Sequence, residues 1–429
     1  MVTRKSFLYS SAIAGAGYLF LYNSGLRERF AEQLQRLKNL STAAAAKDEE
    51  FWSFIRSQYT LSDEIVNLNN GGVSPQPIPV QEAHIKHYKF CNLGPSHYMW
   101  HVLDKDREQL RERMAKSAGC SIDEIAINRN TTEGLNSIIF GLDLQRGDEV
   151  VLSKYDYPNM MNGWRQREKR DGIKLNWVDF DLPEENEEAI VQKFKQAITP
   201  KTKIVHITHM LNWTGQILPA RQIADMAHAH GCEVIVDASH TYAHIPHTIA
   251  ELDCDYYATS LHKWLGAPFG TGFMFIKKDK IKKVWALLSA PEPDGDNIRK
   301  FESLGTRSFA AEFAINAALD FQELVGNKRK VERLRYLKNY WCEKVKNIQG
   351  VKLYTSLNPQ FSGALATFGI EGANPPELVS TLLEKHKLHT TNVMREKVMG
   401  VRVTPHIYTS NKELDILVSA IHQLAKKDK

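Results

Sequence analysis

The stretch over residues 232–274 constrains the fold more than any other part of the chain. An apolar run at 234–236 stops at Asp237, and a second short strand is predicted over 254–259, shortly before Lys263 and a glycine-rich turn. Short apolar runs bounded by polar residues predict buried strands, and open α/β sheets bind ligands at the carboxyl ends of their strands. We therefore expect Asp237 and Lys263 to lie at the ends of two successive strands.

A carboxylate and a lysine placed in this way have a chemical use. A lysine amine can form a Schiff base with the aldehyde of pyridoxal phosphate, and a carboxylate can keep the pyridine nitrogen protonated. The ordinary alternative is that Asp237 caps a helix and Lys263 is solvated, because charged side chains are mostly exposed.

The combination of VDASH at 236–240, SLHKW at 260–264 and the following glycine turn decides between these readings. It resembles the class V aminotransferase branch of the fold-type I enzymes that depend on pyridoxal phosphate. The resemblance implies a Schiff-base lysine at Lys263, a partner for the pyridinium nitrogen at Asp237, a contact with the cofactor's phenolic oxygen at His240, and phosphate contacts from Ser260 and His262. His240 and His244 have helical spacing, but no third ligand or HExxH pattern accompanies them, so we expect no metal site.

Size and composition are those of an ordinary soluble enzyme. The chain has 429 residues, of which 43% are hydrophobic and 24% charged, which is enough for two domains with cores of their own. The net charge of +5 is not concentrated in a basic run, so nucleic-acid binding has little support. Five irregularly spaced cysteines indicate neither a disulfide framework nor a CxxC metal site.

The first residues differ in kind from the rest. Arg4 and Lys5 precede an apolar stretch over 7–22 that is rich in small residues, which is the layout of a secretory signal. The segment also resembles a twin-arginine export signal in which lysine replaces the second arginine. We expect residues 1–25 to be an export signal that directs the protein to the periplasm, or else an uncleaved membrane anchor.

Predicted strands and helices alternate from about residue 100 to 280, which indicates a mostly parallel sheet with helices on both faces. The fold class expected from this pattern and from the resemblance is α/β, with a seven-stranded-type sheet and a smaller α+β C-terminal domain. The expected division is a linker at 26–47, read as a polar helix and then an alanine-rich run, an N-terminal segment at 48–80 that packs on the small domain and the active site, a large cofactor-binding domain at 81–300 and a small domain at 301–429.

A short strand at 125–127 is followed by Thr131 and Thr132 at the start of a helix. This order aims free backbone N–H groups and the positive end of the helix at a phosphate, although any helix start with an N-cap looks similar. The resemblance implies that this loop lies under the cofactor phosphate, with Thr132 as the main side chain and Thr131 beside it.

Further site residues are implied by the resemblance alone. Tyr157 would stack on the pyridine ring, with Tyr155 as the alternative because the register is ambiguous. Asn212 would lie near the phenolic oxygen, and Asn70 and Gly71 beside the substrate. Thr306 follows a glycine in a motif whose threonine reaches the phosphate held by the other subunit, which implies a homodimer with two shared sites.

Arg402 is predicted on a strand between two valines, where a planar guanidinium would suit two-point capture of a substrate carboxylate. A salt bridge at an interface is the alternative. The resemblance implies the carboxylate role.

The expected function is a pyridoxal-phosphate-dependent reaction at the Cα of an amino acid, by an aminotransferase or an epimerase. The whole-chain pattern looks most like isopenicillin-N-epimerase-like members of the family, and a C–S or C–C lyase is the alternative. Cysteine desulfurases need a nucleophilic cysteine near the substrate, and the matching region, 390–396, has none. A non-catalytic exported binding protein with this fold is a further alternative, although it would be expected to have lost Lys263, Asp237 or Arg402.

Overall fold

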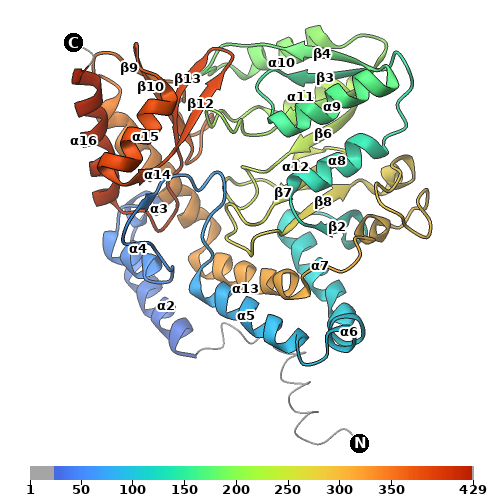
Figure 1. Cartoon of the computed structure of the whole chain (residues 1–429), viewed down its shortest axis with the longest axis horizontal. Helices are drawn as coiled ribbons and strands as arrows, with labels where there is room; N and C mark the ends of the chain where they lie inside the picture. Colours follow the sequence, from blue (N-terminus) through green and yellow to red (C-terminus); the bar gives the residue numbers. More distant parts are fainter. Residues whose placement is uncertain (1–23, 428–429) are drawn as a thin grey trace, which may run out of the picture.

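A seven-stranded sheet forms the centre of the protein in a computed structural model that describes residues 24–427 (Figure 1). Its strand order is β2-β8-β7-β6-β5-β3-β4. The neighbours from β7 to β4 pair in parallel, and β8 runs antiparallel to both β7 and β2. The strands are β2 (Ile125–Asn128), β3 (Glu149–Ser153), β4 (Lys174–Val178), β5 (Thr202–Thr208), β6 (Glu233–Asp237), β7 (Tyr256–Ser260) and β8 (Gly272–Ile276). The predicted α/β class with a mostly parallel seven-stranded sheet is confirmed.

Alternate residues of these strands enter two separate cores, one on each face of the sheet. In β6, Val234 and Val236 belong to one core and Ile235 to the other. This follows from the two-residue period of a strand, and it explains why a parallel strand covered on both faces reads as a continuous apolar run. The first core includes residues from α5 (Ile78–Cys91), α7 (Asp104–Ala118), α10 (Glu187–Ala197), α11 (Ala220–Ala229), α12 (Ile249–Leu252) and α13 (Phe309–Val325), and the second includes residues from α8 (Thr131–Gly141) and α9 (Pro158–Asp171).

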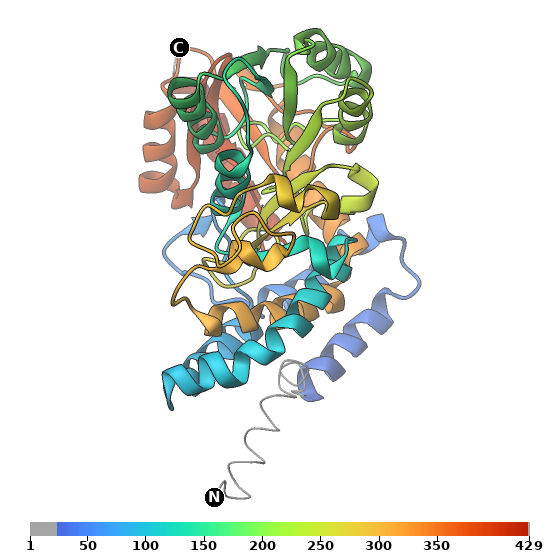
Figure 2. The same ribbon diagram turned by 90° about the vertical axis from the view of Figure 1, so that its right-hand side faces the viewer.

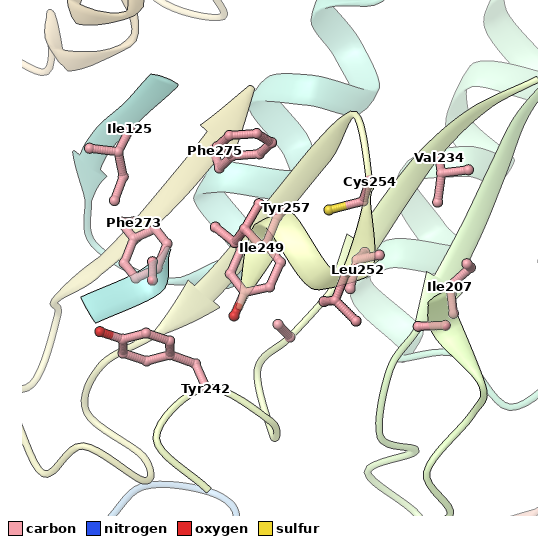
Figure 3. Packing of buried hydrophobic residues seen from close by; sticks show 14 of the residues in the cluster. Ile125, Ile207, Val234, Tyr242, Ile249, Leu252, Cys254, Tyr257, Phe273 and Phe275 are labelled. Atoms are coloured by element: carbon pink, nitrogen blue, oxygen red, sulfur yellow. The ribbon is translucent and has the colours of Figure 1, made fainter. Parts of the chain in front are cut away.

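Aromatic packing anchors the strand that leads to Lys263. Tyr257 of β7 lies parallel to Phe273 of β8 with ring centroids 5.8 Å apart, and Tyr242 meets Phe273 edge-on at 5.1 Å (Figure 3). Burying each of these rings stabilises the fold by roughly 2–3 kcal/mol. The end of β7 is therefore held firmly where the predicted site begins.

The helices α5 and α13 lie side by side below the sheet (Figure 1). Figure 2 shows the blue and cyan N-terminal helices and the orange α13 grouped at the same end of the molecule. The short helical segments are α6 (Pro95–His97), η1 (Tyr98–Leu103), η2 (Ile122–Glu124), η3 (Lys278–Lys283) and η4 (Ile298–Glu302).

The C-terminal part builds a second, smaller α+β unit, as predicted. Its antiparallel sheet has the order β12-β13-β10-β9. The helices cover a separate core around Trp341 and Phe368. The elements are α14 (Asn327–Val345), β9 (Val351–Leu353), β10 (Ala366–Ile370), α15 (Pro375–His386), β11 (Leu388–His389), β12 (Thr391–Arg395), β13 (Val398–Val403) and α16 (Asn411–Lys427).

The segment before the large domain pairs with this smaller unit. β1 (Val66–Asn67) runs parallel to β11, and Asn70 N donates a hydrogen bond to Thr404 O at 3.3 Å. This pairing brings residues 69–71 beside the end of β13. The limits of the predicted domains remain a prediction.

Residues 26–47 contain the expected polar helix, but a second short helix stands where the alanine-rich linker was predicted. They form α2 (Ser24–Leu37) and α3 (Thr42–Ala45), which precede α4 (Glu49–Arg56). Leu26, Phe30 and Leu37 are buried in a cluster with α4 and with Phe321 of α13. Their spacing places them on one side of a helix, and this periodicity was the signal for a packed helix.

The predicted leader at 1–25 lies almost entirely outside the described residues, which begin at residue 24. Within the described chain, none of the helices combines the length and the apolar character that a bilayer crossing requires.

Candidate active site

Asp237 ends β6 and is almost completely buried, with 2% of its surface exposed. Ser239 donates two hydrogen bonds to Asp237 Oδ1, from its backbone N at 2.9 Å and its hydroxyl at 2.6 Å. Burial raises the pKa of Asp237, while the two bonds from Ser239 and the charge of Lys263 act in the opposite direction. Within the described chain, both bonds fall on one oxygen, so Oδ2 remains available to a cationic N–H group.

A chain of hydroxyl groups runs from this carboxylate to the start of α8. Ser239 Oγ lies 2.8 Å from Thr131 Oγ1, which lies 2.8 Å from Ser260 Oγ. Ser260 Oγ also accepts a hydrogen bond from Thr131 N at 2.9 Å. The structure thus brings Thr131 and Ser260 together at a helix start, where N–H groups suit a phosphate, and a phosphate contact by either residue stays a prediction. Ser239 was missed, although it lies within the VDASH motif.

Thr132 lines a cavity of about 350 Å³ with its half-buried side chain. The other lining residues include Arg129, Glu133, Lys300 and Leu304. Arg129 forms an ion pair with Glu133, and the Lys300 amine donates to two backbone oxygens. A contact between Thr132 and a phosphate stays a prediction.

Lys263 follows β7 and is half-buried, with its amine 3.4 Å from His240 Nε2. Burial lowers the pKa of Lys263 to about 8, against the opposing charge of Asp237 and with a smaller contribution from the charge of Arg402. A lysine with this pKa can hold and release a proton near neutral pH. The charge of Asp237 therefore acts on the Lys263 amine. Both residues follow the ends of successive strands, β6 and β7, as the sequence predicts.

His240 is buried and lies between Lys263 and Trp264. Trp264 Nε1 donates a hydrogen bond to His240 Nδ1 at 3.4 Å. Burial lowers the pKa of His240 well below its usual value, and the charges of Lys263 and Arg402 lower it further. His240 is thus a neutral ring beside the lysine amine, where it can bond an oxygen of a bound group.

His262 precedes the lysine and is half-buried. Its Nδ1 lies 3.2 Å from the carbonyl oxygen of Thr271, an acceptor, so this nitrogen carries the proton. Burial and the charge of Lys263 lower the pKa of His262 to about 4. A phosphate contact by His262 stays a prediction.

Arg402 lies on β13 and reaches the carboxyl end of the large sheet. Its guanidinium donates to the backbone oxygen of Asn212 at 3.0 Å and to Asn69 Oδ1 at 2.8 Å. Burial lowers the pKa of Arg402 to about 10. Its Nε has no hydrogen-bond partner within residues 24–427. Asn69, which the sequence did not single out, therefore holds the predicted carboxylate-binding group in place.

Asn212 and the two tyrosines take different positions around Arg402. Asn212 Oδ1 is buried and finds no partner in the described part of the chain. Tyr157 begins α9 with 37% of its surface exposed, and its phenol interacts electrostatically with Arg402. Tyr155 is buried, and its hydroxyl donates to Asp179 at 2.8 Å. This packing makes Tyr155 a core residue and leaves Tyr157 as the candidate for ring stacking.

Asn70 and Gly71 form hydrogen bonds with residues of the C-terminal unit next to the site. Asn70 Nδ2 donates to Thr404 O at 2.8 Å, and its Oδ1 accepts from the Tyr408 hydroxyl at 2.6 Å. Gly71 N donates to Thr404 Oγ1 at 2.8 Å, and a Cβ at Gly71 would lie 2.9 Å from Thr404 Cγ2 and 3.4 Å from His240. Only glycine fits so close an approach, and a substrate contact by either residue stays a prediction.

Thr306 is exposed in the loop between η4 and α13. Its exposure leaves it free to act outside its own chain, and its predicted role at the site of a partner stays a prediction.

This donor set fits pyridoxal phosphate. Within the described chain, a buried carboxylate has one oxygen without a hydrogen bond, a lysine amine has a lowered pKa, hydroxyl groups gather at a helix start, and a buried Asn212 oxygen lacks a partner. In the described residues, no three His, Cys, Asp or Glu side chains gather closely enough to hold a metal ion.

The chain is similar in sequence to a known family and to proteins of two named kinds. The family model described as class V aminotransferase matches residues 66–417. An isopenicillin N epimerase of Amycolatopsis lactamdurans is 28% identical over 87% of this chain and 99% of its own length. A probable cysteine desulfurase of Halalkalibacterium halodurans is 27% identical over 86% of this chain and 95% of its own length.

Solved structures share the fold at lower sequence identity. The apo structure of a cysteine desulfurase from Thermococcus onnurineus superimposes with a TM-score of 0.76 at 21% identity, covering 87% of this chain and 98% of its own. A cystine C–S lyase in complex with cysteine persulfide superimposes with a TM-score of 0.74 at 21% identity, covering 84% of this chain and 98% of its own.

Proposed function

The chain belongs to the class V aminotransferase family and is a pyridoxal-phosphate-dependent enzyme, and from this premise we propose that it acts at the Cα of an amino acid as an aminotransferase or an epimerase. The observation that carries the proposal is the meeting of Lys263, Asp237 and Arg402 at the carboxyl end of the large sheet. The charges of Asp237 and Arg402 both shift the pKa of Lys263, in opposite directions. All three residues that a binding protein would be expected to lose are present.

Each residue has a task in such a reaction. When bound, the cofactor supplies an aldehyde that holds the substrate nitrogen and a ring that accepts the electron pair released at Cα. Arg402 binds the substrate carboxylate and so orients the Cα–H bond. Lys263, with a pKa of about 8, takes or returns the Cα proton as its amine exchanges between neutral and charged forms. Asp237 holds a proton on the ring nitrogen.

The positions and the raised pKa values of the cysteines favour an aminotransferase or epimerase reaction over sulfur transfer. Residues 390–396 contain no cysteine. Burial raises the pKa of Cys342 and of Cys120 to about 12, and it raises the pKa of the other three thiols.

 Cys232 and Cys254 also precede β6 and β7. They therefore lie at the amino ends of these strands, whereas the site lies at the carboxyl ends. Protonated, buried thiols are poor nucleophiles. A C–S or C–C lyase needs no such thiol and remains the alternative reaction.

We also propose that the enzyme is a homodimer whose subunits complete each other's sites. Thr306 is exposed, and its loop neighbour Leu304 lines the cavity that Thr132 shares. Leu287 and Leu288 line the same cavity with nearly half of their surface exposed, and such apolar residues favour a protein contact. Export to the periplasm, or anchoring by an uncleaved leader, is proposed from residues 1–25 alone.

Incubation of the purified holoenzyme with single amino acids in deuterated water tests the reaction. An epimerase would place deuterium at Cα and yield both configurations, whereas an aminotransferase would yield a keto acid and the aminated cofactor. A lyase would release a fragment of the side chain. If no amino acid exchanges its Cα proton and no product forms, the proposed action at Cα is wrong.

A further inference from the structure

Trp264, the residue after Lys263, is completely buried and packed between two imidazole rings. His244 stacks on its indole with centroids 3.8 Å apart and an interplanar angle of 26°, and His406 lies nearly parallel to it at 5.8 Å and 15°. Lys330 Nζ donates a hydrogen bond to the backbone oxygen of Trp264. The indole and the backbone that carries it are therefore held in one position.

The held indole sets the protonation of His240. An indole N–H is a donor only, so His240 Nδ1, which lies 3.4 Å from Trp264 Nε1, must be the acceptor. In a neutral imidazole the other nitrogen then carries the proton. That nitrogen, Nε2, lies 3.4 Å from the amine of Lys263.

The neighbouring histidine has the opposite arrangement. His244 Nδ1 lies 2.6 Å from the backbone oxygen of His240, and its Nε2 lies 2.8 Å from the backbone N–H of Ala364. An oxygen acceptor at one nitrogen and an N–H donor at the other fix the proton of His244 on Nδ1. This bond also ties the backbone of His240 to the ring that stacks on Trp264.

We propose that Trp264 is a positioning residue that fixes the proton of His240 on Nε2, so that this N–H faces Lys263 and favours its uncharged amine. An N–H beside an amine can donate to the lone pair of the neutral form but repels the ammonium form. The other tautomer would present a lone pair that accepts a hydrogen bond from the ammonium and so stabilises its charge. The uncharged amine is the form that attacks an aldehyde, so the inference rests on the proposed use of Lys263.

Other charged and titratable groups also face the Lys263 amine. Asp237 on β6, Arg402 on β13 and His262 beside the lysine all interact with it electrostatically. Replacing Trp264 by phenylalanine leaves these residues unchanged and keeps an aromatic ring between His244 and His406. The substitution thus removes the N–H donor together with part of the buried ring volume, for which a control is needed.

The rate at which apoprotein captures added pyridoxal phosphate, measured by absorbance against pH, reports the uncharged fraction of Lys263. Apoprotein is prepared from holoenzyme, and the linkage at Lys263 is verified by borohydride reduction and peptide mapping. We expect Trp264→Phe to move the midpoint of the profile to higher pH by about half a unit to one unit, which slows capture at pH 7 by about three- to tenfold. Trp341→Phe is the matched control, because Trp341 is also fully buried and its N–H has no partner in the described chain.

A second starting variant, His240→Gln, separates the effect of the His240 tautomer from the other effects of replacing Trp264. In His240→Gln the side-chain amide can donate whatever the indole does, so Trp264→Phe should cause no further shift there. Equal midpoints for wild type and Trp264→Phe, or the same shift in both backgrounds, would overturn the inference. Wild-type protein that captures the cofactor at no lysine, or at one other than Lys263, would instead contradict the proposed function.

Nitrogen-15 NMR of labelled histidines in the apoprotein reads the tautomer without any variant of Trp264. The His240 signals are assigned by their loss in His240→Gln. A proton on Nε2 is expected in the wild type, and a proton on Nδ1 would overturn the inference even if Trp264→Phe fails to fold.

Discussion

Asn69 accepts a hydrogen bond from Arg402 at 2.8 Å, although the two residues come from opposite ends of the chain. The pairing of β1 with β11 brings them together, and the isolated bridge between Asn69 and Thr404 fixes their register. Asn69 Nδ2 also lies 3.5 Å from His389 Nε2, so its carboxamide is held from the other side. The N-terminal segment thus positions the guanidinium that would bind the substrate carboxylate.

Asn69→Ala should weaken substrate binding more than it slows the chemical step. A hydrogen bond to a charged group contributes about 1.5–3 kcal/mol, and its loss lets Arg402 adopt other rotamers. We expect KM to rise about tenfold with kcat changed less than about threefold. Steady-state kinetics will measure both constants. Asn69→Gln keeps an uncharged amide acceptor and serves as the control, and an unchanged KM in Asn69→Ala would contradict the role of this residue.

Asp237→Asn should leave the cofactor bound but slow the reaction. The amide has the shape of the carboxylate but not the charge that holds a proton on the ring nitrogen. Loss of a preorganised electrostatic contact of this kind slows catalysis by about 10²- to 10³-fold. Turnover and cofactor affinity are measured on the same preparation. Ser239→Ala, which removes one bond to Asp237 Oδ1, should have a smaller effect, and full activity of Asp237→Asn would exclude the assigned role.

Local sequence predicted the elements of this fold better than it predicted the contacts between them. The apolar run before Asp237 and the glycine turn after Lys263 identify two strand ends, because burial on both faces leaves a continuous apolar pattern. The bond between Asn69 and Arg402 has no local signal, since it depends on a pairing between distant segments. The register of Tyr155 and Tyr157 was ambiguous in sequence, and only the burial of Tyr155 separates them.

Residues 26–47 show the opposite case, because the polar helix was expected but the alanine-rich run after it was interpreted wrongly. The alanine-rich run at 43–46 suggested a linker, whereas two of these alanines, Ala45 and Ala46, are buried against other helices. Small side chains allow close packing as readily as they form flexible segments. The apolar spacing of Leu26, Phe30 and Leu37 was the more informative pattern.

Asp156 should make the stability of the apoprotein depend on pH. Burial, with a smaller contribution from the charge of Asp237, raises the pKa of Asp156 to about 7 against hydrogen bonds from Thr208 and Ser153. The unfolded chain loses this proton near pH 4, whereas the folded chain keeps it until about pH 7. Because the folded state binds more protons in this range, the free energy of unfolding falls as the pH rises from about 4 to 7, and the loss is complete above that range.

Asp156→Asn removes this ionisation and keeps an acceptor for the backbone N–H of Ser153, which lies 3.0 Å from Asp156 Oδ2. We expect the variant apoprotein to gain a few degrees in Tm over wild type at pH 8 and little at pH 4. Calorimetry at both pH values will measure the difference. An equal gain at both would show that the ionisation of Asp156 is not its cause.

Mixed dimers should reveal whether Thr306 acts across subunits. Lys263→Ala and Thr306→Ala homodimers are both expected to be poor enzymes. A dimer with one chain of each kind contains one site with both residues intact if Thr306 serves the partner, so it should recover up to about half of the wild-type activity per dimer, as expected from one intact site of two. Differently tagged chains allow the mixed dimer to be purified. Activity no higher than the mean of the two parents, or a monomer in light scattering, would contradict the shared site.

The most direct measurement is the location of the covalent cofactor on the native protein. Three other described lysines are buried and have lowered pKa values, Lys300, Lys330 at about 7 and Lys338 at about 8, so they are the natural competitors for an aldehyde. The protein is purified with its cofactor, reduced with borohydride, digested and mapped by mass spectrometry. We expect one pyridoxyl phosphate group, on Lys263, and none in Lys263→Ala; a group on any of the other three lysines, or no group on any peptide, would contradict the proposed site.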